Sequence, residues 1–222
     1  MDETGATGDL RAGEFSTWLV EMDDALRGER DADVSCGTCM ACCTASQFIH
    51  IGPEETDALA HIPGALLFPA PRMPAGHVVM GYDQRGHCPM LVDNRCSIYG
   101  HRPRTCRTYD CRVFPASGVE LDEAEKVLIA ARAARWRFEE TTEASRVQRE
   151  AVRSAAAFLI SHPDAHPAGA ARSATELAVR SVEAHRVFLR TTESATHPKS
   201  VGTGNPTSDE VRVEFTRPRS IR

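Results

Sequence analysis

The chain has 222 residues, of which 41% are apolar and only 6% aromatic, and this suits one packed domain with a core of small and branched aliphatic side chains. Its formal net charge of -5 argues against a nucleic-acid binder that works by bulk charge. The acidic start lacks the basic and apolar regions of a signal peptide, and no apolar run reaches the ~18–20 residues of a membrane span. We therefore expect a cytoplasmic protein with reduced thiols.

The N-terminal third is expected to begin with a disordered lead over residues 1–12. Residues 13–29 place apolar side chains at steps of four, three and four, which predicts a short amphipathic helix. FIHI, residues 48–51, is a candidate strand. Residues 52–61 should form a helix, because proline suits its first turn and acidic residues suit its positive end.

The middle of the chain predicts loops and short strands. Residues 63–76 contain four prolines and two glycines and should be a loop, whereas HVVMGY, residues 77–82, reads as a strand. CPMLV and CSIY flank Asp93-Asn94-Arg95, which indicates a small hairpin or knuckle.

From Leu121 onward the pattern becomes helical, and residues 120–190 are expected to form a helical region. Three stripes mark helix faces: Leu121, Leu128, Ala131 and Phe138; Val147, Ala151, Ala155, Phe158 and Leu159; and Leu177, Ser181, Ala184 and Phe188. Residues 191–222 should be a mostly disordered tail, although VRVEF at 211–215 alternates like a strand. Together these elements predict an α+β fold with a single metal-binding domain over residues 13–190.

The chain contains eight cysteines, all within about a third of its length. In a reducing compartment they read as metal ligands or catalytic groups and not as a disulfide framework. The first group has the spacing C-x2-C-x2-C-C and the second C-x7-C-x9-C-x4-C. The eight are Cys36, Cys39, Cys42, Cys43, Cys88, Cys96, Cys106 and Cys111.

The first cysteine group can bring several thiolates to one ion. A C-x2-C step turns the backbone so that both sulfurs point inward, and the repeated step occurs in bacterial ferredoxins. Zinc, which takes four sulfurs tetrahedrally, can use the same spacing. Because neighbouring side chains usually diverge, Cys42 and Cys43 should not both bind one mononuclear ion. Eight thiolates could form two four-sulfur sites, or one site beside structural or reactive cysteines.

The cysteine-rich segment is also basic. Residues 86–112 contain five arginines against two aspartates, whereas residues 1–33 contain ten acids against three arginines. Guanidinium groups near a thiolate site would offset its negative charge, and a solvated basic face is the alternative interpretation. Five histidines lie in the wider cysteine-rich segment of residues 36–115, and they are expected to be mostly surface groups or partners of the metal ligands: His50, His61, His77, His87 and His101.

CGTCMACC, followed by CPMLVDNRCSIYGHRPRTCR, resembles the YkgJ-type cysteine-cluster family, which is known for its CxxCxxCC motif and described as zinc- or iron-chelating. The resemblance covers roughly residues 36–115 and includes FIHIGPEE between the two cysteine groups. It implies that the metal ligands are Cys36, Cys39, Cys42, Cys43, Cys88, Cys96 and Cys106. Cys111 lies just beyond the shorter form of the motif and is an additional ligand candidate.

Three functions fit these observations. The leading hypothesis is a protein that carries an iron–sulfur cluster in a redox or accessory role. The second is a structural zinc module, with Zn²⁺ stabilising a loop-rich region that binds a protein partner. The third is a metal-dependent modifying enzyme, because protein-lysine methylases of bacterial flagellin show a similar cysteine cluster. The chain has no Walker loop and no GxGxxG after a strand, so the sequence leaves open whether it is an enzyme.

Overall fold

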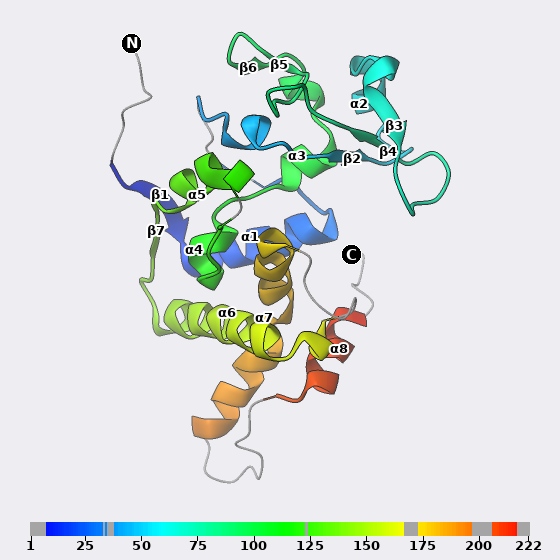
Figure 1. The fold of residues 1–222 in the computed structure, drawn as a ribbon. Coiled ribbons are helices and arrows are strands. Elements are labelled where there is room, and N and C mark those ends of the chain that lie inside the picture. The colour runs from blue at the N-terminus through cyan, green and yellow to red at the C-terminus, as the bar shows by residue number, and fades with distance from the viewer. Residues whose placement is uncertain are drawn as a thin grey trace. The chain divides into compact units, whose positions relative to one another are not determined.

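The computed structural model describes residues 8–32, 34, 38–122, 124–166, 173–196 and 206–216. Its helices and short strands confirm the predicted α+β class (Figure 1). One domain was expected over residues 13–190, whereas the chain divides into two compact units. Among the described residues, the first unit holds 28–110 and 122–132, and the second holds 8–27, 111–121 and the part from 133 onward.

The first unit contains an antiparallel sheet with the order β2-β4-β3. Strands β2 (Ile49–Ile51) and β4 (Val78–Met80) lie where the sequence predicted them. Strand β3 (Leu67–Pro69) lies in the segment expected to be a loop, so that expectation was wrong. Its proline is tolerated because β3 is an edge strand, where a missing N–H need not break the ladder.

A second small ladder in this unit joins β5 (Leu91–Val92) to β6 (Arg95–Cys96), and it confirms the predicted hairpin. Asp93 and Asn94 form its two-residue turn with φ values of 48° and 59°. Positive φ at both positions is typical of a type I′ turn, for which these residue types are favoured.

The remaining elements of the first unit are short helices and helical turns. The predicted helix after residue 52 is confirmed as α2, which begins at Thr56 and ends at His61. The others are η1 (Ala41–Thr44), η2 (Gly64–Leu66), η3 (Tyr99–His101), α3 (Arg104–Thr108), η4 (Ala124–Lys126) and the greater part of α5 (Val127–Ala133). A small core of Ile51, Ala58, Ile62, Met80 and Ile98 packs α2 and the start of η3 against strands β2 and β4.

The second unit begins with a parallel strand pair, β1 (Leu10–Glu14) and β7 (Trp136–Glu139). Phe138 therefore lies on a strand, and its expected place in a helical stripe was wrong. The predicted helix of residues 13–29 is confirmed as α1 (Phe15–Arg27). Phe138 packs between the rings of Phe15 and Trp18, with centroids 5.1 and 4.9 Å away, so an aromatic cluster ties β7 to α1.

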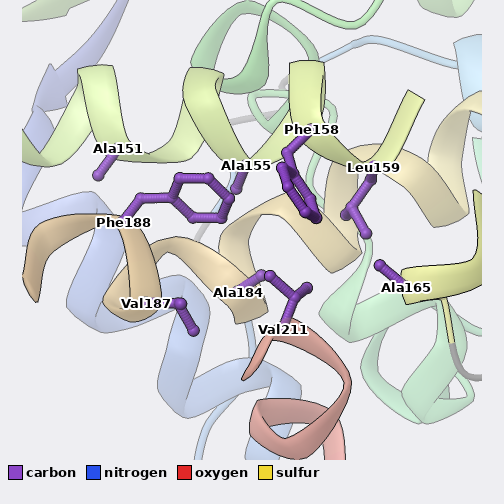
Figure 2. Packing of buried hydrophobic residues seen from close by; sticks show 9 residues of the cluster. All are labelled: Ala151, Ala155, Phe158, Leu159, Ala165, Ala184, Val187, Phe188 and Val211. Carbon is purple, nitrogen blue, oxygen red and sulfur yellow. The ribbon is translucent and has the colours of Figure 1, made fainter. Parts of the chain in front are cut away.

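The other helices of the second unit surround a larger apolar core (Figure 2). They are α4 (Val113–Ser117), α6 (Glu143–Ser161), η5 (Pro163–Ala165), α7 (Ala174–Thr196) and α8 (Ser208–Thr216). The predicted stripes of α6 and α7 form this core, where the rings of Phe158 and Phe188 meet edge to face at 5.6 Å. No helix in the described part of the chain is both long and apolar enough to cross a membrane.

The segment VRVEF forms helix α8 and not a strand, which corrects the alternation seen in the sequence. A capping box explains the helix: the Thr207 N–H donates to the Glu210 carboxylate at 2.7 Å, and the Glu210 N–H donates to the Thr207 hydroxyl at 3.3 Å. Val211 is fully buried in the core of α6 and α7. Part of the tail expected to be disordered is therefore helical, and residues 10–12 of the lead expected to be disordered belong to strand β1. Residues 1–7, 197–205 and 217–222 lie outside the described residues.

Candidate metal centre

The first cysteine group turns through η1. Cys36 lies outside the described residues, whereas Cys39 and Cys43 are half-buried and Cys42 is exposed. The hydroxyl of Thr44 donates to the carbonyl of Met40 at 3.1 Å and closes the turn. The different exposure of Cys42 and Cys43 agrees with the expectation that adjacent side chains diverge.

Backbone hydrogen bonds fasten this turn to the start of the second cysteine group. The Cys88 N–H donates to the Cys43 carbonyl at 2.7 Å, and the Ser46 N–H donates to the Gly86 carbonyl at 2.9 Å. Gly86 has φ 79°, and a Cβ there would lie 2.2 Å from the Ser46 hydroxyl oxygen. Glycine at this position therefore permits the close approach that places Cys43 beside Cys88.

A tight turn at Asp83 leads the chain into Cys88. The Asp83 carboxylate accepts the backbone N–H groups of Arg85 at 2.8 Å and His87 at 2.9 Å. These hydrogen bonds lower the pKa of Asp83, and the one from His87 has the largest effect. The carboxylate therefore stays charged and keeps accepting the N–H groups that form the turn. His87 thus contributes backbone geometry next to the cysteine.

Cys88 and Cys96 belong to the knuckle that contains the β5–β6 hairpin. Cys96 pairs with Leu91 in the ladder, and the amides of Met90 and Leu91 donate toward the Cys88 sulfur. Burial raises the pKa of Cys88, and the nearby Cys96 raises it further against those amide bonds. Both side chains also pack against the apolar core of the first unit. The knuckle therefore presents two sulfurs in a partly dry setting.

Cys106 is placed by α3, whose start is fixed from elsewhere in the unit. The Glu55 carboxylate accepts the backbone N–H groups of Gly52 at 2.8 Å and Arg104 at 2.5 Å. The Thr105 hydroxyl donates to the His50 carbonyl at 2.7 Å. These contacts anchor the helix that carries Cys106 to α2 and β2.

The thiol of Cys106 lies within electrostatic range of three other cysteines. Burial raises the pKa of Cys106 to about 12, and the negative charges of Cys88, Cys43 and Cys96 contribute to the rise in that order. Arg102 opposes them and lowers the pKa. We call Cys43, Cys88, Cys96 and Cys106 the thiol quartet. Such a group is unfavourable as four bare thiolates, and a bound cation would relieve the repulsion.

The donor set of the thiol quartet suits soft, sulfur-binding metals. Four sulfurs match a closed tetrahedral zinc site, and they equally match the four corners of an iron–sulfur cluster. Cys42 lies on η1 beside Cys43, and Cys39 precedes this turn, so the same segment offers two further thiols. The residues present therefore fit either group.

Cys111 belongs to the second unit, where it is buried and its sulfur accepts a hydrogen bond from the Trp136 indole N–H at 3.2 Å. Its role as a ligand, like that of Cys36, stays a prediction.

The arginines of the basic segment differ in what they contact. Arg102 acts on Cys106, whereas the Arg107 guanidinium contacts the exposed carboxylate of Asp31 at 3.2 Å. Arg112 lies in the second unit and donates to the Ala12 carbonyl. The predicted electrostatic role is thus supported for Arg102.

A short-stranded α+β unit in which three cysteine-bearing segments lie near one another is typical of a metal-binding cysteine-cluster protein. Residues 35–132 match the family model described as CxxCxxCC, a putative zinc- or iron-chelating domain, which is the family that the motifs resemble. The similarity covers the cysteine-rich segment, which is less than half of the chain. No significant similarity to a curated protein or to a solved structure accompanies this match.

Proposed function

We propose that the domain holds an iron–sulfur cluster and gives the protein a cytoplasmic redox or accessory role. The observation that carries the proposal is the placement of the thiol quartet: the Cys88 N–H donates to the Cys43 carbonyl at 2.7 Å, Cys88 and Cys96 belong to one knuckle, and the charges of these three cysteines act on Cys106. Four thiolates from separated segments are the ligand set that a cubane cluster requires.

The number of thiols favours a cluster over one zinc ion. The quartet alone supplies the four sulfurs of a closed zinc site. Cys39 and Cys42 belong with Cys36 to the C-x2-C-x2-C spacing that ferredoxins use for iron, and Cys42 lies next to Cys43 on η1. These additional thiols could bind an iron atom of the cluster in place of a quartet thiol, or they could bind a second metal centre.

The second candidate is a structural zinc site that stabilises a surface for a protein partner. The knuckle favours it, because the amides of Met90 and Leu91 already stabilise charge on the Cys88 sulfur in a closed turn. The small core of the first unit is a further argument, since a metal ion can supply folding energy that such a core lacks.

Metal and acid-labile sulfide analysis, with a visible spectrum of protein purified without oxygen, distinguishes the two candidates. We expect a brown protein with iron and sulfide in similar amounts. A colourless protein with stoichiometric zinc would establish the second candidate instead. Protein without either metal, even after anaerobic reconstitution, would overturn both.

Cysteine substitutions then test the ligand set. Cys106→Ser should abolish stable metal binding, because it removes one corner of the thiol quartet. Cys111→Ser tests whether the eighth cysteine also binds the metal: because the native sulfur accepts a hydrogen bond from Trp136 in the second unit, we expect a smaller loss of metal than in Cys106→Ser. Equal metal loss in both variants would contradict the quartet as the centre.

A further inference from the structure

Two histidines and an aspartate meet on the surface of the first unit, and none of them belongs to the thiol quartet. Asp57 and His61 are four residues apart on α2, so their side chains lie on one face of the helix. His101 comes from η3, which lies between Cys96 and Cys106 in the sequence. The fold therefore brings three potential ligands together from two segments.

The three side chains lie near the spacing of metal ligands, although the His61 Nδ1 atom also lies 2.8 Å from the Asp57 carbonyl oxygen, and an ion at that nitrogen would displace this contact. The Nδ1 atom of His101 lies 2.9 and 3.1 Å from the two carboxylate oxygens of Asp57, and the Nδ1 atom of His61 lies 3.6 Å from one of them. One ligand atom from each residue can be chosen so that all three lie within 4.8 Å of one another. Around a tetrahedral zinc ion with bonds near 2.0 Å, ligand atoms are about 3.3 Å apart.

The two imidazole rings are stacked, so one of them must turn before both in-plane lone pairs can point at one ion. The His61 and His101 rings stack with centroids 3.5 Å apart and planes only 6° from parallel. Their side chains are 40% and 45% exposed, and that of Asp57 is 67% exposed, so an ion can reach them without unfolding. Binding would replace the hydrogen bond from His101 to Asp57 by two bonds to the ion, with loss of the bridging proton.

We propose that Asp57, His61 and His101 form a second metal site, which binds a divalent transition-metal ion such as Zn²⁺ independently of the cysteines. Two imidazoles and one carboxylate select zinc, copper or nickel over magnesium and calcium. Three protein ligands leave a coordination position for water, as in open zinc sites. Because the ligands are exposed, we expect this ion to exchange readily with solution.

The test uses the full chain with its cysteine centre loaded, so that added metal reports only on further sites. Zn²⁺ alone is titrated into this protein and followed by calorimetry, and bound metal is counted after equilibrium dialysis. We expect one additional ion per chain. Substitution of a partner that merely orients a metal ligand typically costs about 10–100-fold in affinity, so His61→Ala and His101→Ala should each weaken this extra binding at least about tenfold.

A matched control is available in the same unit. His77 lies 3.0 Å from the ring nitrogen of His50 in a second histidine pair, and His77→Ala should leave the extra binding unchanged. Retained cysteine-bound metal and an unchanged circular dichroism spectrum show that the variants are folded. Extra zinc that binds equally well to wild type, His61→Ala and His101→Ala would overturn the proposal, as would the absence of any additional ion at millimolar Zn²⁺. Neither result depends on which metal occupies the cysteines.

Discussion

The two units of this chain are stabilised by different means. The second unit packs long amphipathic helices around an apolar core that includes Phe158, Phe188 and Val211. The first unit has short strands, single helical turns and a smaller core, against which the half-buried Cys88 and Cys96 pack. These thiols occupy positions that aliphatic side chains fill in other small domains. The stability of the first unit should therefore depend on what the thiols bind. The comparison therefore predicts that metal supports one unit and apolar burial the other.

Metal removal should have the largest effect. Binding of structural zinc contributes about 10–16 kcal/mol in small zinc domains, so loss of the metal should unfold the segment that carries the thiol quartet. Hydrogen exchange measured by mass spectrometry, before and after chelation, is the direct check. Peptides from residues 39–106 should lose protection, whereas peptides from α6 and α7 should keep it. Uniform loss across both units would remove the distinction between them.

A truncation in the second unit should give the opposite pattern. The Phe158 side chain is 7% exposed and stacks on the His162 ring at 4.0 Å, so Phe158→Ala should lower the free energy of unfolding by about 3–5 kcal/mol. Metal content should stay unchanged. Chemical denaturation followed by circular dichroism, with metal analysis in parallel, measures both. Ile160→Ala is the control, because Ile160 is 64% exposed on the same helix and should change stability by less than about 0.5 kcal/mol.

Acid should weaken the metal centre. Burial and the neighbouring thiolates raise the pKa of Cys106 to about 12, so near neutral pH this thiol is protonated until a cation displaces the proton. Affinity should therefore fall as pH falls, by about tenfold per pH unit for each proton released, or about 1.4 kcal/mol. Competition with a chelator at several pH values gives the slope. An affinity that does not change with pH would contradict protonated quartet thiols in the unloaded protein.

The smallest effect is expected at the start of α6. The Thr142 hydroxyl accepts the Ser145 N–H at 3.1 Å, so Thr142→Ala removes an N-cap and should cost about 1 kcal/mol. Thermal unfolding of the second unit measures the loss. Thr141→Ala changes the preceding exposed residue, and its transition should match that of wild type. A metal affinity altered by Thr142→Ala would show that the two units are not independent.

Local patterns predicted the metal-binding region well, because its features depend on near neighbours. The Asp93-Asn94 turn and the strands around it follow from residue preference over a few positions. Strand β7 was missed because its partner β1 is far away in sequence, and the spacing of Phe138 happened to suit a helix. The period of two in VRVEF hid α8, although the capping box of Thr207 and Glu210 could be read from the sequence.

For the candidate sites, too, the sequence predicted what depends on near neighbours and missed what depends on distant contacts. The sequence identified the cysteines, yet it could not show which of them lie near one another in the first unit, since that depends on tertiary packing. Asp57 and His61 are spaced for one face of a predicted helix, which was a usable signal. Their meeting with His101 comes from tertiary packing, and periodicity carries no information about it.

The parallel pairing of β1 with β7 has a consequence for synthesis of the chain on the ribosome. Residues 10–14 emerge early but cannot pair until residues 136–139 have been added. At about 5–20 residues per second this delay is on the order of ten seconds. The whole thiol quartet is translated within that interval, since Cys106 precedes β7. Metal can therefore bind to the nascent first unit before β7 is available to complete the second unit. The supply of metal during translation would then decide whether metal binding precedes the pairing of β1 with β7.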